Sequence, residues 1–167
     1  MDANKILYAK EGRVYVLKFV GAIRYTMGCA LDDFLDRLFR QDDFDQIVID
    51  LTETTSIDST SLGLLAKIAN LLRARNGSKI TLVSSNEDIN QILDSMGFYQ
   101  IFNVCDKYQN CREALQNLEF SDPTKDKMGK TMLEAHNILS ELNDTNRQRF
   151  ENVVGTLKKA NSLVTSH

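Results

Sequence analysis

A serine at the start of a predicted helix is the clearest candidate for chemistry in this sequence. Ser59 directly follows Asp58, after the polar stretch 52–56 and before an apolar segment with helical spacing. Asp58 is a good N-cap residue, which makes Ser59 the first residue of the helix. The unpaired N–H groups and the dipole of a helix N-terminus tolerate negative charge. This geometry suits a phosphorylation site at Ser59, but on these residues alone a purely structural capping serine is the more common interpretation.

The residues that follow Ser59 have more ordinary interpretations. Thr60 and Ser61 fall on the first helical turn, where we expect neighbours of the site rather than second phosphate acceptors. Gly63 lies one turn into the helix, where glycine costs up to about 1 kcal/mol relative to alanine. We therefore expect the backbone at Gly63 to pack closely against the sheet.

Motifs of common enzymes are missing from the sequence. It has no phosphate-binding loop, no nucleophile elbow and no dinucleotide-binding glycine motif. Its two histidines, His136 and His167, both follow the predicted main domain, so that domain contains no base for Ser59. We expect His136 to be a surface or interface residue rather than a ligand. The sequence predicts a protein that is not an enzyme and needs no cofactor.

Composition limits the class of protein and its compartment. The chain has 167 residues, 43% of them hydrophobic, which suffices for one good core and a small appendage. Its net charge of -3, with both signs mixed, favours neither nucleic acid nor an anionic membrane as partner. Cys29, Cys105 and Cys111 form no C-x-x-C pair, which indicates reduced thiols and no zinc site. Without a long apolar run or a signal-peptide pattern, we expect a cytoplasmic protein.

The elements that must position Ser59 alternate along the chain as in an α/β protein. A turn at Glu11-Gly12 joins the first two strands into a hairpin, and the later alternation requires parallel pairs with right-handed crossovers. We expect a mixed five-stranded sheet with helices mainly on one face, in a domain of residues 1–120. The predicted strands are 5–10, 13–20, 47–51, 79–84 and 101–104, and the predicted helices are 28–40, 59–75, 86–96 and 108–118.

A helical extension of residues 121–167 follows this domain. Asp122 and Pro123 are typical of an N-cap and a first helical residue, and Asn143-Asp144 interrupts the helical pattern further on. The extension is therefore a helical hairpin or one kinked helix. Its narrow apolar stripes must pack on the main domain or on a second copy of the chain, which leaves a homodimer open. The stripes are Met128, Met132, Ala135, Leu139 and Leu142, then Phe150, Val153, Leu157, Ala160 and Val164.

One stretch of the sequence resembles a known family. A strand that ends in Asp50-Leu51, followed by Ile-Asp-Ser-Thr-Ser-Leu-Gly over residues 57–63, is similar to the signature of STAS domains. Within that family the resemblance is strongest to the bacterial anti-sigma-factor antagonists, and it covers roughly residues 1–118. The usual motif has glycine two residues after the phosphorylated serine, where this chain has Ser61.

The resemblance implies a function in signal transduction and transcription regulation. In unphosphorylated form the chain would bind an anti-sigma factor and free the sigma factor, while a serine kinase and a phosphatase would act on Ser59. A parallel neighbour would place the loop at Arg24 and Tyr25 near this serine, and in such antagonists that neighbourhood binds the partner. The implied partner surface comprises Arg24, Tyr25, Asp58, Ser59, Thr60 and Ser61.

Two other interpretations of the sequence compete with this one. The alternative function is a non-catalytic STAS scaffold or accessory subunit of a signalling or transport complex. A phospho-acceptor receiver domain, suggested by Asp50, Ser84 and Lys107, is disfavoured. Its acidic pair would have to follow the first strand, whereas Asp32-Asp33 lies inside a predicted helix.

Overall fold

The computed structural model describes residues 4–108 and 114–165, with the backbone alone at 164 and 165. Within these ranges seven strands form one mixed sheet in the order β6-β5-β3-β2-β1-β7, with β4 paired to β2 beside that row. The α/β class and the initial hairpin predicted from the sequence are confirmed, whereas the expected number of five strands is wrong. The strands are β1 (Lys5–Glu11), β2 (Val14–Ile23), β3 (Gln46–Asp50), β4 (Thr54–Ile57), β5 (Ile80–Val83), β6 (Phe102–Cys105) and β7 (Gln116–Asn117).

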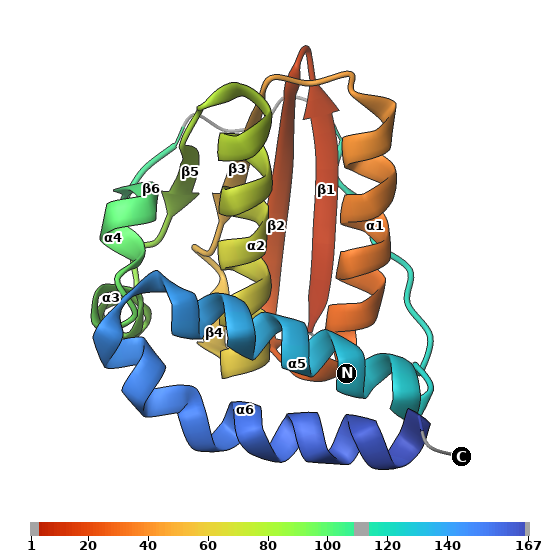
Figure 1. The fold of residues 1–167 in the computed structure, drawn as a ribbon. Coiled ribbons are helices and arrows are strands. Elements are labelled where there is room, and N and C mark those ends of the chain that lie inside the picture. The colour runs from red at the N-terminus through yellow and green to blue at the C-terminus, as the bar shows by residue number, and fades with distance from the viewer. Residues whose placement is uncertain (1–3, 109–113, 166–167) are drawn as a thin grey trace.

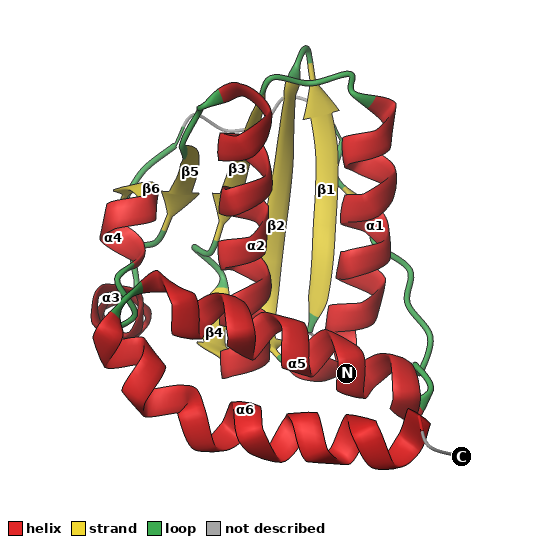
Figure 2. Ribbon diagram, in the orientation of Figure 1, coloured by secondary structure: helices red, strands yellow, loops and turns green. Residues whose placement is uncertain are grey.

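Helices cover one face of the sheet, as expected (Figure 1). Two long helices lie along this face, and a C-terminal hairpin of two further helices crosses their lower ends (Figure 2). The predicted helical hairpin is thereby confirmed, and it packs on the main domain of its own chain. The helical elements are η1 (Tyr25–Met27), α1 (Gly28–Gln41), α2 (Ser59–Asn76), α3 (Glu87–Ser95), α4 (Phe98–Ile101), α5 (Lys125–Leu142) and α6 (Asp144–Thr165).

Strand β4 lies in a stretch that we expected to be a polar loop. Its partner is the end of β2, which runs on to Ile23, three residues beyond the predicted strand 13–20. Thr54 is 2% exposed, and its hydroxyl donates a hydrogen bond of 2.7 Å to the carbonyl of Phe19. Threonine suits strands through its branched Cβ, and here a backbone acceptor also satisfies its hydroxyl. The polar stretch before α2 therefore contains a short strand that its composition did not indicate.

The helix expected over 108–118 is wrong in its described part. Residues 116–117 form β7, which pairs with β1, and the Tyr8 hydroxyl donates to Gln116 Oε1 at 3.1 Å. Pairing with β1 satisfies backbone groups that an edge strand would leave open, and this outweighs the helical spacing of the apolar residues. Ala114 and Leu115 are exposed, while Leu118 is buried. Residues 109–113, with Cys111, lie outside the described residues.

The C-terminal hairpin differs from its prediction in its helix starts and in one apolar stripe. Helix α5 begins at Lys125 behind Thr124, whose side chain accepts from the N–H of Lys127, rather than at Pro123. Val153 and Ala160 are exposed although the narrow stripe placed them inward. Residues Phe150, Val154, Leu157 and Asn161 are buried or half-buried instead, at the four- and three-residue spacing of a straight helix. The side chain of Val164 lies outside the described residues.

The main core lies between the sheet and its helices. Leu17 and Ile49 are fully buried there, while Val16 and Val48, their neighbours in sequence, belong to a smaller apolar cluster on the opposite face. Successive side chains of a strand point to opposite faces, so burial of both explains the apolar run of β3. The helix that carries Ser59 therefore packs on a rigid central strand.

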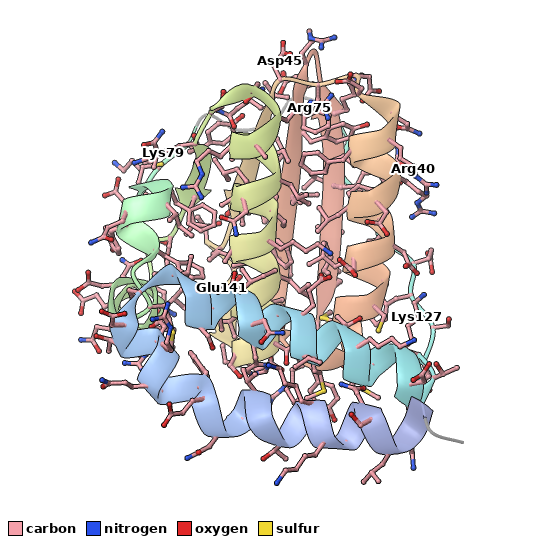
Figure 3. The ribbon with its side chains drawn as sticks, in the orientation of Figure 1. Arg40, Asp45, Arg75, Lys79, Lys127 and Glu141 are labelled. Atoms are coloured by element: carbon pink, nitrogen blue, oxygen red, sulfur yellow. The ribbon has the colours of Figure 1, made fainter. Side chains whose placement is uncertain are left out.

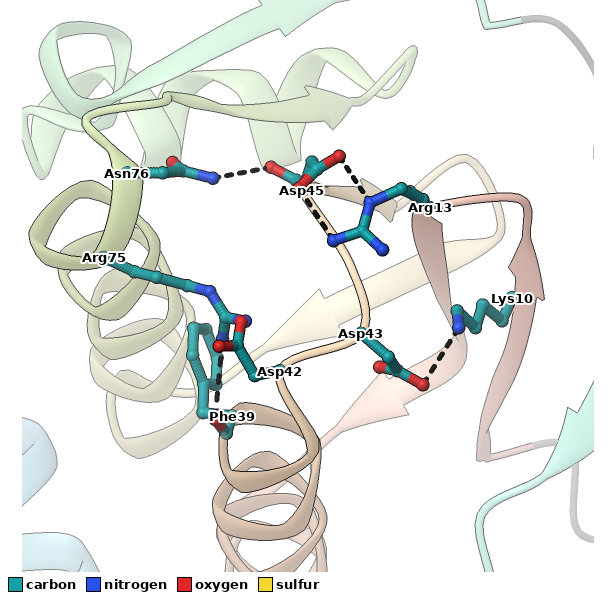
Figure 4. A network of polar contacts seen from close by, with 8 residues as sticks. All are labelled: Lys10, Arg13, Phe39, Asp42, Asp43, Asp45, Arg75 and Asn76. Carbon is teal, nitrogen blue, oxygen red and sulfur yellow. Dashed lines mark hydrogen bonds and ion pairs between the residues drawn. The ribbon is translucent and has the colours of Figure 1, made fainter.

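Ion pairs hold together the end of the sheet remote from Ser59 (Figures 3 and 4). The Arg13 guanidinium donates to both carboxylate oxygens of Asp45, at 2.7 and 3.1 Å. This contact lowers the pKa of Asp45 and raises that of Arg13. Arg75, near the end of α2, pairs with Asp42 and lies over the Phe44 ring. These contacts fix the C-terminal end of α2. Ser59 lies at the opposite, N-terminal end of the same helix.

Candidate functional site

Asp58 organises the N-terminus of α2. Its Oδ1 accepts from the N–H of Ser61 at 2.9 Å, and its backbone carbonyl accepts from the N–H of Leu62 at 3.0 Å. The predicted N-cap role of Asp58 is thus confirmed. Its other oxygen, Oδ2, accepts from the N–H of Tyr25 at 2.6 Å. One carboxylate therefore caps α2 and fixes η1 beside it.

Arg24 and Tyr25 lie where the sequence placed them, next to the start of α2. Both side chains are exposed, Tyr25 to 40%. The N–H of Asp58 donates to the carbonyl of Ile23 at 3.1 Å, because β4 continues the parallel pairing with β2 up to that point. The geometry brings Arg24, Tyr25, Asp58 and Ser59 to one edge of the molecule.

Ser59 is half-buried and forms a hydrogen bond that the sequence did not predict. Its Oγ lies 2.8 Å from Nε2 of His136, a residue of α5. Nδ1 of the same ring lies 2.7 Å from the carbonyl oxygen of Met132. A carbonyl only accepts, so Nδ1 carries a proton, and in the neutral ring Nε2 accepts the proton of the Ser59 hydroxyl. The Ser59 hydroxyl is therefore directed at α5.

Of the two environments expected for His136, the structure shows the interface and not the surface. His136 is 3% exposed, and its ring edge meets the ring of Phe150 on α6 with centroids 5.6 Å apart. Sequence reasoning missed its partner because 77 positions separate the two residues. His136 follows Ala135, a residue of the predicted apolar stripe. This position indicates that His136 is buried, but it does not indicate that Ser59 is its partner.

Thr60 and Ser61 are buried, at 3% exposure each. Thr60 lies beside Gly28 of α1, where Thr131 of α5 also packs. In this arrangement neither side chain is open to a partner. Their predicted role in binding therefore depends on a change that uncovers the start of α2.

Gly63 marks the closest approach of α5 to α2. A Cβ at this position would lie 2.2 Å from the carbonyl oxygen of Ala135 and 2.7 Å from its Cβ. The expected contact between Gly63 and the sheet is therefore wrong, because the close neighbour is the tail helix. Glycine lets two helix backbones approach at a distance that any side chain would prevent.

Polar contacts surround this helix crossing. Lys67 of α2 pairs with Asp32 of α1 at 2.6 Å and with Glu134 of α5. Burial alone would lower the pKa of Lys67, but its hydrogen bonds to these two carboxylates outweigh burial and raise it. Cys29 of α1 lies 3.4 Å from the Thr131 hydroxyl and is 4% exposed. Three helices thus share one interface.

The turn between α5 and α6 is anchored on the main domain. The side-chain amide of Asn146, which is fully buried, donates to the carbonyl of Met96 at 2.9 Å. Asn143 donates to the same carbonyl at 3.4 Å and accepts from the N–H of Asn146 at 2.8 Å, which caps α6. The C-terminal hairpin is thus fixed both at its turn and at the Gly63 crossing.

The described residues provide neither a membrane segment nor a metal cluster. Within residues 4–108 and 114–165, none of the helices combines the length and apolar character that crossing a bilayer requires. In the same part of the chain, no three side chains of His, Cys, Asp or Glu gather where they could hold a metal ion.

Comparisons with known proteins agree with this fold. The STAS domain family profile matches residues 5–111, which leaves α5 and α6 outside the matched range. The structure is similar to that of the anti-sigma factor antagonist SpoIIAA in its unphosphorylated form, with a TM-score of 0.52 and 14% sequence identity over 61% of this chain and 87% of that chain. At this identity the likeness concerns the fold alone. A comparison with curated protein sequences finds no match.

Proposed function

The chain belongs to the STAS domain family, and from this membership we propose that it is an anti-sigma-factor antagonist controlled by phosphorylation of Ser59. The observation that carries the proposal is the position of the Ser59 hydroxyl. It lies in the first turn of α2, next to the Asp58 cap that also fixes the exposed Tyr25 segment. A phosphate on Ser59 would therefore lie next to a surface that a partner protein can bind.

The proposed switch acts through charge at a binding surface. A phosphate adds about -1.5 to -2 charges at neutral pH, and the N-terminus of α2 tolerates that charge within the fold. At an interface that excludes water, the same group costs desolvation and repels acids on the partner. Unphosphorylated protein therefore binds the anti-sigma factor and frees the sigma factor, and phosphorylated protein releases it.

The proposal includes the proteins that set the state of Ser59. A serine kinase adds the phosphate and a phosphatase removes it, in the cytoplasm of a bacterium. The chain itself acts by binding and not by catalysis. The second candidate, a constitutive STAS scaffold or accessory subunit, gains support from the hydrogen bond of Ser59 to His136, because a hydroxyl so held needs no modification to be satisfied.

Two full-length variants test the proposed function. Ser59→Ala keeps the small side chain without a phosphate acceptor, and we expect it to bind the anti-sigma factor constitutively. Ser59→Asp carries a negative charge at the same position, and we expect it to bind at least about tenfold more weakly. Affinity capture from the native cell, followed by titration of the captured protein, measures both. Equal binding by the two variants would contradict the switch and favour the scaffold.

A further inference from the structure

The surface proposed to bind a partner already has an occupant in this chain. Helix α5 crosses the N-terminal ends of α1 and α2, and α6 packs along α5, below it in the view (Figure 1). The N-terminal end of α2 carries Ser59, which bonds to His136 of α5. Thr60 and Ser61 are buried in the same turn. A partner that must touch these residues cannot do so while α5 is in place.

The contact between α5 and α2 is specific in shape and in charge. Gly63 lets the backbone of Ala135 approach α2 closely. Lys67 forms an ion pair with Glu134, the residue that precedes Ala135. The residue after Ala135, His136, accepts a hydrogen bond from the Ser59 hydroxyl. Three consecutive residues of α5 thus match three positions along one face of α2, at its first, second and third turns. Such matching is expected of a docking site and not of a loosely covering tail.

A phosphate on Ser59 and docked α5 require the same space. The imidazole ring lies 2.8 Å from Oγ, whereas a phosphorus atom and three oxygens would have to be attached to that oxygen. If the ring withdraws along with its helix, Ala135 separates from Gly63 and Glu134 from Lys67. Attraction between the phosphate and a protonated His136 would therefore be available only after the packing of α5 is lost.

From these contacts we infer that the C-terminal hairpin, α5 with α6, is a built-in competitor for the Ser59 surface. It must leave α2 before a kinase or a binding partner can reach Ser59, and phosphorylation of Ser59 then prevents its return. The partner that replaces it meets Gly63 at a helix crossing and Lys67 beside it. The surface therefore fits a protein helix that presents a small residue over Gly63 and a carboxylate to Lys67.

The inference rests on the proposed function for the identity of the partner, but the docking of the hairpin can be measured without one. If the open form makes up about 1% of molecules, a partner that binds only this form shows an apparent affinity about 100-fold weaker than its intrinsic one. Loosening the hairpin should therefore strengthen partner binding without any change to the partner surface.

Cys29 provides a natural reporter of hairpin opening. It lies under Thr131 of α5 and is 4% exposed, so movement of α5 should raise the rate of its alkylation by iodoacetamide. Cys105 packs against the apolar cluster on the other face of the sheet and serves as an internal reference. Mass spectrometry of tryptic peptides separates the two labels in one sample of the full chain.

A pair of glycine variants forms the matched experiment. Gly63→Ala adds a methyl group where the Ala135 backbone lies, whereas Gly155→Ala adds the same group to α6 with nothing within 4 Å. We expect Gly63→Ala to raise the rate of Cys29 alkylation at least about tenfold relative to Cys105, and Gly155→Ala to leave it unchanged. An unchanged Cys29 rate in Gly63→Ala would overturn the inference.

Phosphoserine incorporated at position 59 supplies a second measurement that does not alter the glycine contact. We expect its Cys29 to react at least about tenfold faster than that of Ser59→Ala. Equal rates would mean that phosphate and the docked hairpin coexist, which overturns the inference. Hydrogen exchange in β3 should stay slow in both proteins, since opening of the hairpin leaves the central strand intact.

Partner binding separates this inference from the proposed function. An increased affinity of His136→Ala, which loosens α5 and leaves the surface of α2 unchanged, for a captured anti-sigma factor supports both. If Cys29 of Gly63→Ala is alkylated fast, but neither this variant nor the wild type binds an anti-sigma factor, the hairpin is supported as an occupant of the Ser59 surface and the proposed function is refuted. Slow alkylation with tight binding of an anti-sigma factor refutes the hairpin and leaves the proposed function standing.

Discussion

Replacing Gly63 by alanine should destabilise the folded chain even though alanine is the better helix former. In α2 the substitution gains about 1 kcal/mol of helix propensity. Against this, the new Cβ would lie 2.2 Å from the carbonyl oxygen of Ala135, an atom of a helix backbone that no side-chain rotation can move. Overpacking of this kind typically costs about 1–3 kcal/mol. We expect a net loss of up to about 2 kcal/mol.

The loss has an upper limit set by the hairpin itself. Because α5 and α6 lie outside the layer of α1 and α2, they can separate from α2 and relieve the overlap (Figure 1). The cost of Gly63→Ala therefore cannot exceed the free energy with which the hairpin docks. For a chain of this size, about 1 kcal/mol corresponds to roughly 2–4 °C in Tm.

Gly155→Ala is the matched control for this measurement. It makes the same chemical change on α6, where nothing lies within 4 Å of the added methyl group. We expect it to raise the free energy of unfolding by about 0.5–1 kcal/mol. Thermal unfolding followed by circular dichroism compares the three proteins. If Gly63→Ala raises Tm as Gly155→Ala does, the close approach of α5 to α2 is wrong.

Two further perturbations address the polar contacts of the hairpin. His136→Ala removes the acceptor of the Ser59 hydroxyl and the ring that meets Phe150, and we expect urea titration to show a loss of about 1–3 kcal/mol, with no loss as the contradicting result. The raised pKa of Lys67 contributes stability that is fully present below its ordinary value of 10.5 and is lost as pH rises through the higher folded value. Alkaline titration should therefore destabilise the wild type more than Lys67→Met, and parallel profiles would refute the coupling.

The sequence predicted those parts of the fold that local rules determine. Asp58 caps α2, as its residue type indicates. The alternation of strand and helix likewise determined the parallel core of the sheet. In each case a few neighbouring residues contain the whole signal.

The parts that could not be predicted depend on residues far apart in the sequence. Thr54 becomes part of a strand because the end of β2 lies beside it, and Gln116 does so because β1 lies beside it. His136 reaches Ser59 from the tail because α5 crosses α2 at Gly63. The sequence indicated that Gly63 needs a close neighbour, but not that this neighbour is a helix outside the STAS match.

The attachment of α5 to the sheet sets the strength of competition at Ser59. Strand β7 is paired with β1, and the N–H of Leu118 donates to the carbonyl of Ile6, so that residues 119–124 form the tether of α5. A tether this short holds its helix at an effective concentration of about 1 mM or more. This value does not change with the amount of protein in the cell. A partner must therefore compete against a constant effective concentration of α5. Its own concentration and affinity decide whether it displaces α5 from α2.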